Sequence, residues 1–194
     1  MRKLMVVGLL ILPLLVAGCS KGPAEAALKA ADEAIAKVKR SAEMYVPDQF
    51  AALAKEADNA KALFDKGDYA AALAAAKDLP SKASDVQSAV TAKKDEIMKT
   101  WTEMQGSMPS LVQGLTDKVG ALVAMKRLPK GFDAAQLETA KTSLTSVTEG
   151  WTAATAAFGG GNLIGAVKNG SAAKTKAGEL TTLLEAVTLP LAKK

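Results

Sequence analysis

The 194-residue chain contains no histidine and a single cysteine, Cys19. This composition excludes serine–histidine triads, cysteine–histidine nucleophiles, the usual structural zinc sites and disulfides within the chain. The formal charge of +5 shrinks if a leader carrying Arg2 and Lys3 is removed, because 23 basic residues then face 20 acidic ones. No basic stripe with interleaved aromatics is evident, so nucleic-acid binding is not expected. Nor is an enzyme expected, because no convergent set of carboxylates, lysines or tyrosines is visible.

The N-terminal segment has the pattern of a lipoprotein export signal. Two basic residues precede an apolar run from Leu4 to Ala17, and small residues then lead to Cys19. The run is about 14 residues, short of the roughly 20 that a bilayer-spanning helix needs. We therefore predict that residues 1–18 are removed as a signal peptide and that the Cys19 thiolate takes a covalent lipid. A plain secretory signal in front of a buried thiol is the alternative.

Abundant alanine and few aromatic residues favour closely packed helices over a sheet. The expected fold is all-α, an elongated bundle of about six helices built from two antiparallel helical-hairpin units. We expect four segments, namely the signal (1–18), the acylated cysteine with a short tether (19–23), a first helical unit (24–106) and a second unit (107–194). Because the tether is short, the folded body is expected to lie close to the membrane.

Prolines, glycines and capping residues set the expected helix boundaries. A first helix covers about 24–44 and ends before Pro47, and a second runs from the N-cap Asp48 to residue 66. Gly67 then takes a left-handed conformation, and Asp68 caps the next helix. Pro80 either kinks that third helix or opens a new one that reaches about residue 104.

Three further helices are expected in the second half of the chain. The fourth begins near Pro109 and ends before Pro129, the fifth covers 133–158, and the sixth covers 162–187. Gly159, Gly160 and Gly161 form the turn between the last two, and a binding site for an anion at these glycines is the less favoured interpretation.

A sequence pattern in the first half of the chain recurs in the second half at an offset of 94 residues. The apolar seam Phe50, Leu53, Ala57, Ala60 and Phe64 recurs as Leu144, Val147, Trp151, Ala154 and Phe158. The turn motif Phe-x-x-Gly-(Asp/Asn) also recurs, at Phe64–Asp68 and at Phe158–Asn162. Such spacing indicates an antiparallel α-hairpin in each copy. Duplication is the favoured interpretation, and convergence of two hairpins is the alternative.

The first copy resembles a family of Ala-rich bacterial lipoprotein domains of unknown function. The resemblance rests on Tyr45-Val46-Pro47, the Ala-spaced helix after it and Gly67-Asp68-Tyr69, and it covers about residues 24–94. Tetratricopeptide-like hairpins share the Gly-Asp-Tyr element. The resemblance implies an outer-membrane lipoprotein with a helical-hairpin body, and it carries over no catalytic residue. Ser20 after the acylated cysteine is similar to the signal that sends Gram-negative lipoproteins to the outer membrane.

Two groups of large side chains are candidates for a partner or ligand surface. Methionines and an aromatic gather at Met98, Trp101, Met104 and Met108, where the core of the bundle is the alternative interpretation. Trp151 and Gly170 stand where the first copy has alanines. A large ring beside a glycine, with Phe158 nearby in the sequence, indicates either that the ring packs into the space left by the glycine or that a shallow pocket lies there. A threonine stripe, at residues 145, 148, 152 and 155, lines either a helix contact or a polar groove.

The expected function is that of a lipid-anchored, non-enzymatic module in the cell envelope, facing the periplasm from the outer membrane. It would bind a protein partner or peptidoglycan. The alternative is a periplasmic carrier of lipid or another small apolar ligand, held around Trp151, Phe158 and Gly170. No cofactor is expected apart from the lipid on Cys19.

Overall fold

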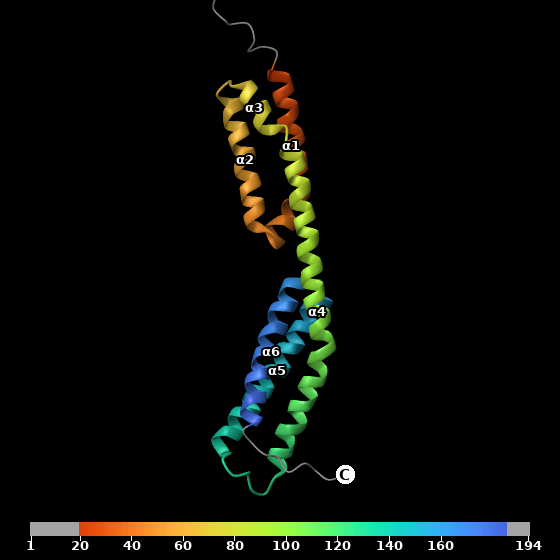
Figure 1. Ribbon diagram of the computed structural model, residues 1–194, viewed down its shortest axis with the longest axis vertical. Helices are drawn as coiled ribbons and strands as arrows, with labels where there is room; N and C mark the ends of the chain where they lie inside the picture. Colours follow the sequence, from red (N-terminus) through yellow and green to blue (C-terminus); the bar gives the residue numbers. More distant parts are fainter. Residues whose placement is uncertain (1–19, 186–194) are drawn as a thin grey trace, which may run out of the picture. The chain divides into compact units, whose positions relative to one another are not determined.

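The computed structural model describes residues 20–185, and all regular structure in this range is helical (Figure 1). The expected all-α class is thereby confirmed. The predicted signal peptide and Cys19 lie outside the described residues. The six helices are α1 (Lys21–Tyr45), α2 (Pro47–Asp65), α3 (Tyr69–Ala76), α4 (Leu79–Ala124), α5 (Ala134–Gly159) and α6 (Leu163–Glu185).

The chain divides into two compact units between Lys93 and Lys94, inside α4. The first unit contains α1, α2, α3 and the first part of α4, whereas the second contains the rest of α4 with α5 and α6. The division falls before the expected boundary between Gly106 and Ser107, because Trp101 and Met104 belong to the core of the second unit.

The start of the first unit differs from the expected tether. Residues 21–23 form the first turn of α1 rather than an extended linker. Pro23 is tolerated there because the first backbone N–H groups of a helix have no intrahelical acceptor. Only Ser20 therefore separates α1 from the position of Cys19.

The prediction that Asp48 is the N-cap of α2 is wrong. The helix begins at Pro47, and the capping position is taken by Val46, with φ −142° and ψ 56°. Proline disfavours a helical conformation in the residue before it, so Val46 leaves the α region and α1 ends at Tyr45. The ring of Pro47 is itself suited to the first helical position.

Pro80 lies at the start of a new helix rather than at a kink within the third helix, the two alternatives that the sequence left open. The short helix α3 ends at Ala76, and α4 begins at Leu79 with Pro80 in its first turn. A proline is accepted there for the same reason as Pro23 in α1.

The expected break near Pro109 is absent, because α4 runs through this proline. An interior proline costs about 3 kcal/mol in lost hydrogen bonding and steric clash. Met108 and Leu115, on either side of it, are buried in the core of the second unit. Burying two such side chains contributes about 1.5–3 kcal/mol each, enough to offset the cost of the proline.

Each unit has its own apolar core. In the first, Phe50 and Leu53 of α2 pack with Val38 of α1 and with Leu79 and Val86 of α4. In the second, the buried face of α4 packs with α5 and α6, and the largest members are Trp101, Met108, Leu122, Val147, Leu180 and Leu184. The first core is therefore made by α1, α2, α3 and early α4, and the second by late α4, α5 and α6.

The two turns that share the Phe-x-x-Gly-(Asp/Asn) motif have the same backbone hydrogen bonds. In the first, Gly67 N–H donates to Phe64 O at 2.9 Å and Asp68 N–H donates to Leu63 O at 3.0 Å. In the second, Gly161 N–H donates to Phe158 O at 2.9 Å and Asn162 N–H donates to Ala157 O at 2.9 Å. This pair of bonds is the Schellman helix ending.

The glycine and the cap of each turn also match. Gly67 and Gly161 have φ values of +82° and +78°, in the left-handed region that favours glycine. Asp68 Oδ1 accepts from Ala71 N–H at 3.1 Å, and Asn162 Oδ1 accepts from Gly165 N–H at 2.9 Å. The predicted left-handed Gly67 and capping Asp68 are thus confirmed.

A further correspondence, which the sequence comparison missed, relates α1 to the second part of α4 at an offset of 77 residues. The buried positions Ala24, Ala31, Val38 and Ala42 correspond to the buried positions Trp101, Met108, Leu115 and Val119. The order of elements therefore matches in the two units, with α1 corresponding to late α4, α2 to α5, and α3 together with early α4 to α6. The offset differs from 94 partly because Val46 alone joins α1 to α2, whereas residues 125–133 join α4 to α5. The rest of the difference arises because α5 begins ten residues before Leu144 whereas α2 begins three before Phe50, and because α4 extends further past the last corresponding position than α1 does.

The left-handed turns give the first prediction. Gly67→Ala and Gly161→Ala should each lower the free energy of unfolding by about 1 kcal/mol, because a β-carbon is disfavoured at positive φ. Gly106→Ala is the matched control, since a β-carbon at this exposed helical position has open space. It should stabilise the protein by about 0.5 kcal/mol. Urea unfolding followed by circular dichroism measures all three, and unchanged stability in both turn variants would contradict the assignment.

Candidate functional site

The five residues proposed as a partner or ligand surface come together in the second unit. The ring of Trp101, from α4, is stacked on Trp151 of α5, with centroids 5.3 Å apart and an interplanar angle of 21°. It is also stacked on Phe158, at 4.7 Å and 15°. Offset stacks of this kind contribute about 0.5–1.5 kcal/mol each beyond the area they bury.

Gly170 of α6 leaves the space into which the rest of this cluster packs. A β-carbon on Gly170 would lie 3.1 Å from both Cε and Sδ of Met104 and 3.6 Å from Cζ3 of Trp151. Ser171 Oγ lies 3.9 Å from Met104 Sδ, to which it donates. The thioether therefore fills the gap beside the missing side chain. We refer to Trp101, Met104, Trp151, Phe158 and Gly170 as the aromatic cluster.

Burial corrects the expectation that this cluster is an exposed surface. Trp101 is 1% exposed and Met104 is 3% exposed, and Gly170 is also buried. These three residues belong to the core, which was the alternative interpretation of the methionine-rich segment. Trp151 and Phe158 are half-buried, so their outer edges are the part of the cluster that solvent or a partner reaches.

One polar atom in the aromatic cluster has no partner. Nε1 of Trp101 is buried and has no hydrogen-bond partner within residues 20–185. Leaving such a donor unsatisfied costs about 1–3 kcal/mol, so the stacking and burial of the indole must exceed that cost. Packing, rather than hydrogen bonding, therefore positions this side chain.

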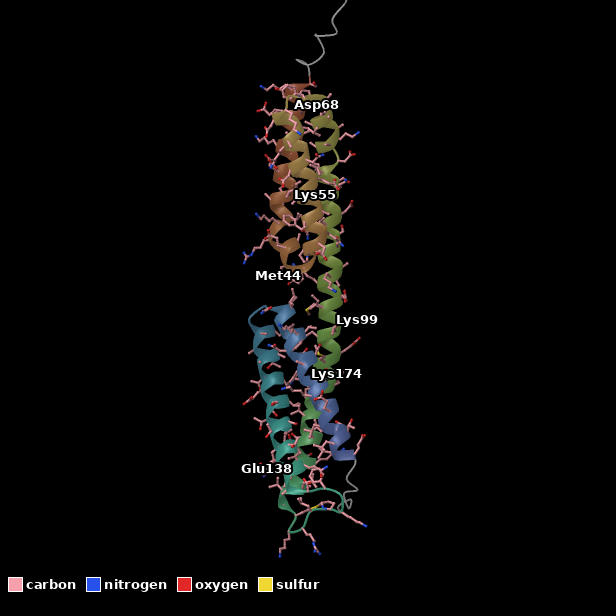
Figure 2. The ribbon with its side chains drawn as sticks, turned by 90° about the vertical axis from the view of Figure 1, so that its left-hand side faces the viewer. Met44, Lys55, Asp68, Lys99, Glu138 and Lys174 are labelled. Atoms are coloured by element: carbon pink, nitrogen blue, oxygen red, sulfur yellow. The ribbon has the colours of Figure 1, made fainter. Side chains whose placement is uncertain are left out.

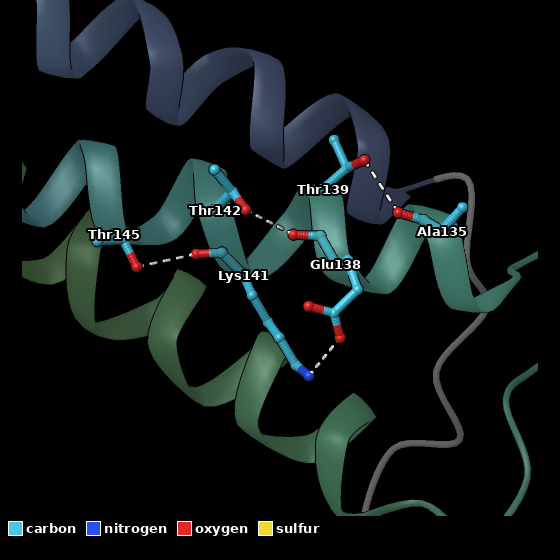
Figure 3. Close-up of polar contacts among 6 residues, drawn as sticks. All are labelled: Ala135, Glu138, Thr139, Lys141, Thr142 and Thr145. Carbon is cyan, nitrogen blue, oxygen red and sulfur yellow. Dashed lines mark hydrogen bonds and ion pairs between the residues drawn. The ribbon is translucent and has the colours of Figure 1, made fainter.

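The threonines of α5 bond to their own helix (Figure 3). Thr139, Thr142 and Thr145 donate to the carbonyl oxygens four residues earlier, at 2.9, 3.0 and 3.1 Å. Thr148 does the same at 2.9 Å. Their hydroxyl protons are thus already used.

Part of the stripe lines an open groove between α4 and α5. Its lining consists of Thr116, Leu144, Thr145, Thr148 and Glu149. Thr145 and Thr148 therefore border an open groove rather than a closed helix contact, and the exposed lining of that groove is mostly apolar. The hydroxyls present mainly acceptor lone pairs to the groove, because their protons are bonded within the helix.

The candidate ion sites are ordinary turn structures. In the described part of the chain, no group of three acidic side chains is placed to hold a metal ion. Asp68 caps α3, and the amide N–H of Gly161 is used within the turn. The carboxylate of Asp32 pairs with Lys61 at 2.8 Å on the surface. Between residues 20 and 185, no helix is long and apolar enough to cross a membrane.

Comparison of the chain with protein-family models, curated proteins and solved structures finds no match. The class that the geometry itself defines is an all-α protein with two units, the first of four helical segments and the second of three. The resemblance to Ala-rich lipoproteins therefore depends only on the motifs quoted above.

Packing in the aromatic cluster gives the second prediction. Gly170→Ala should destabilise the protein by about 1 kcal/mol, because the new methyl group meets Met104. In a Met104→Ala background the same change should instead stabilise, since the methyl group enters the vacated space. The free energies of unfolding in urea give this double-mutant cycle.

Gly178→Ala is the control for the cycle. Gly178 is an exposed position on the same helix, and its β-carbon would meet open space. It should stabilise by about 0.5 kcal/mol in both backgrounds. If Gly170→Ala raises the free energy of unfolding as Gly178→Ala does while Met104 is still present, the proposed contact between position 170 and Met104 does not exist.

Proposed function

We propose that this chain is a lipid-anchored, non-enzymatic protein of the cell envelope that acts as an adaptor for a protein partner or peptidoglycan. The observation that carries the proposal is the export signal, in which an apolar run and small residues precede Cys19. Ser20 in the following position supports an outer-membrane location facing the periplasm.

The form of the first unit is consistent with an anchor at Cys19. Because α1 begins at Lys21, a lipid on Cys19 would lie within about 7 Å of the helix along the chain. The lipid and the first unit would therefore act as one body at the membrane surface. A module so close to its anchor would meet partners that are themselves near the membrane.

Repetition supports an adaptor built from two diverged copies of one helical unit. The Schellman bonds, the left-handed glycine and the side-chain cap all agree between the two turns. In this interpretation α2 and α3 with early α4 form one antiparallel hairpin, and α5 and α6 form the other. The two copies differ in side-chain size at Trp151 and Gly170, where the first copy has Ala57 and Ala76.

We place the partner contact at the end of the second unit that carries the α5–α6 turn. Trp151 and Phe158 are half-buried there, and Ile164, just after the turn, is 37% exposed. Rigid aromatic edges beside an exposed aliphatic residue are typical anchors for protein partners. The carrier alternative receives less support, because Met104 occupies the space beside Gly170 that a ligand would need.

Crosslinking in intact cells, followed by purification and mass spectrometry, tests this function. Wild-type protein should carry the mass of a lipid on Cys19, fractionate with membranes and retain a discrete protein or peptidoglycan fragment. Cys19→Ala should lose the lipid and the membrane fractionation. An unmodified Cys19 in wild-type cells would refute the anchor, and recovery of bound lipid alone would favour the carrier.

A surface substitution tests the partner contact separately. Ile164→Ser should reduce partner capture with little change in stability, because the side chain is partly exposed. Val123→Ser is the matched control, since Val123 is an exposed aliphatic residue near the other end of the second unit. Equal capture by both variants would exclude the proposed contact.

A further inference from the structure

The end of the first unit at which α1 begins also carries the α2–α3 turn (Figure 1). Nζ of Lys21, the first residue of α1, lies 5.8 Å from the ring centroid of Tyr69. The Tyr69 ring contacts Phe64 edge to face, with centroids 5.0 Å apart and an interplanar angle of 65°. The turn is therefore held against the start of the chain segment that follows Cys19.

The backbone of this turn does not require the particular side chains that the turn carries. The second turn makes the same backbone hydrogen bonds with Gly160 where the first has Lys66, and with Leu163 where it has Tyr69. A lysine and a tyrosine are thus not needed to close the turn. Lys66 is exposed and Tyr69 is partly exposed in addition to packing on Phe64, so both side chains are available to a surface outside the unit.

The chemistry of these side chains suits the surface of a bilayer. Tyrosine is favoured at the membrane interface because its ring is apolar and its hydroxyl is polar. A lysine buries its apolar stem and keeps its ammonium group among headgroup phosphates. Asp65 and Asp68 lie in the same turn, but Asp68 faces the start of α3, where it accepts from Ala71 N–H.

We propose that this end of the first unit, formed by Lys21, Lys66 and Tyr69, is a membrane-contact surface that rests on the headgroups of the bilayer. The inference depends on the proposed anchor, because a lipid on Cys19 would bring the bilayer to this end. The lipid supplies the affinity for the membrane, and the contact sets the orientation of the first unit.

Lysine footprinting on vesicles tests the orientation. Cys19 is the only cysteine, so the processed chain, residues 19–194, can be coupled through it to a maleimide phospholipid. The vesicles contain phosphatidylethanolamine and phosphatidylglycerol, and a soluble maleimide gives the reference state. A membrane-impermeant acylating reagent then labels the lysines, and mass spectrometry measures the rate at each position.

Lys66 is the informative position and Lys55 is the internal control. Figure 2 shows Asp68, in the turn, at one end of the unit, Lys55 along α2 and Met44 at the opposite end. Both lysines are exposed. Coupling to vesicles should slow the labelling of Lys66 about fivefold relative to Lys55, the factor for about 1 kcal/mol of lysine–headgroup attraction. An unchanged ratio of the two rates would overturn the proposal.

Tyr69→Leu separates the contact from simple proximity to the anchor. Leucine occupies the equivalent position, Leu163, in the second turn, so the variant is expected to fold. Labelling of Lys66 on vesicles should return toward its rate in the soluble reference, and full retention of its protection would exclude Tyr69 from the contact. A synthetic lipid replaces the natural one in this experiment, so its outcome does not depend on acylation of Cys19 in cells. The membrane contact can therefore be refuted while the anchor is upheld, and the anchor can be refuted while the contact is upheld.

Discussion

Close approach of helices through small residues is the constraint on which both units depend. In the first unit most of the fully buried positions are alanines, among them Ala42, Ala60, Ala72 and Ala76. Each alanine buries little apolar area, so tight contact between backbones must supply dispersion energy that larger side chains would otherwise provide. Where the approach is closest an extra methyl group has little room, as at Gly150 of α5, whose β-carbon would lie 3.2 Å from Cβ of Ala173 in α6.

The helix endings follow from the same close packing. Two helices that pack tightly and reverse direction within a few residues need a compact turn that satisfies its own backbone groups. The Schellman bonds at Gly67 and Gly161 and the side-chain caps at Asp68 and Asn162 meet this need in both units. Since the backbone groups are satisfied locally, the remaining side chains of each turn are free to differ, as Lys66 and Gly160 do.

Sequence reasoning succeeded where local chemistry decides the structure. The left-handed Gly67 and the capping role of Asp68 depend on backbone sterics and on one side-chain bond, and both were predictable. The break expected at Pro109 did not occur, because burial of Met108 and Leu115 outweighs the cost of an interior proline. That balance depends on contacts with α5 and α6, which local sequence does not reveal.

The sequence placed the residues of the aromatic cluster in two separate groups, and it predicted neither that the groups meet nor that Trp101, Met104 and Gly170 are buried. Trp151 and Gly170 stood out as departures from the first copy, and this difference marks a packing site as readily as a binding site. The relation of α1 to the second part of α4 was not recognised, because the longer connection at residues 125–133 and the longer start of α5 change the offset between the units. This relation aligns Trp101 with Ala24, and both are buried in the structure.

The two units differ at equivalent places in the fold, the turn and the layer of side chains next to it. In the first unit this layer has Ala24, Ala57 and Ala76 beside Phe64, and the turn carries Lys66 and Tyr69. In the second, the turn carries glycines and the layer carries the aromatic cluster. A surface that contacts a bilayer needs amphipathic side chains on the turn, whereas a surface that holds a protein needs rigid aromatics supported from within. This distribution of residues supports the two proposals made above, in which the first unit contacts the membrane and the second unit contacts a partner.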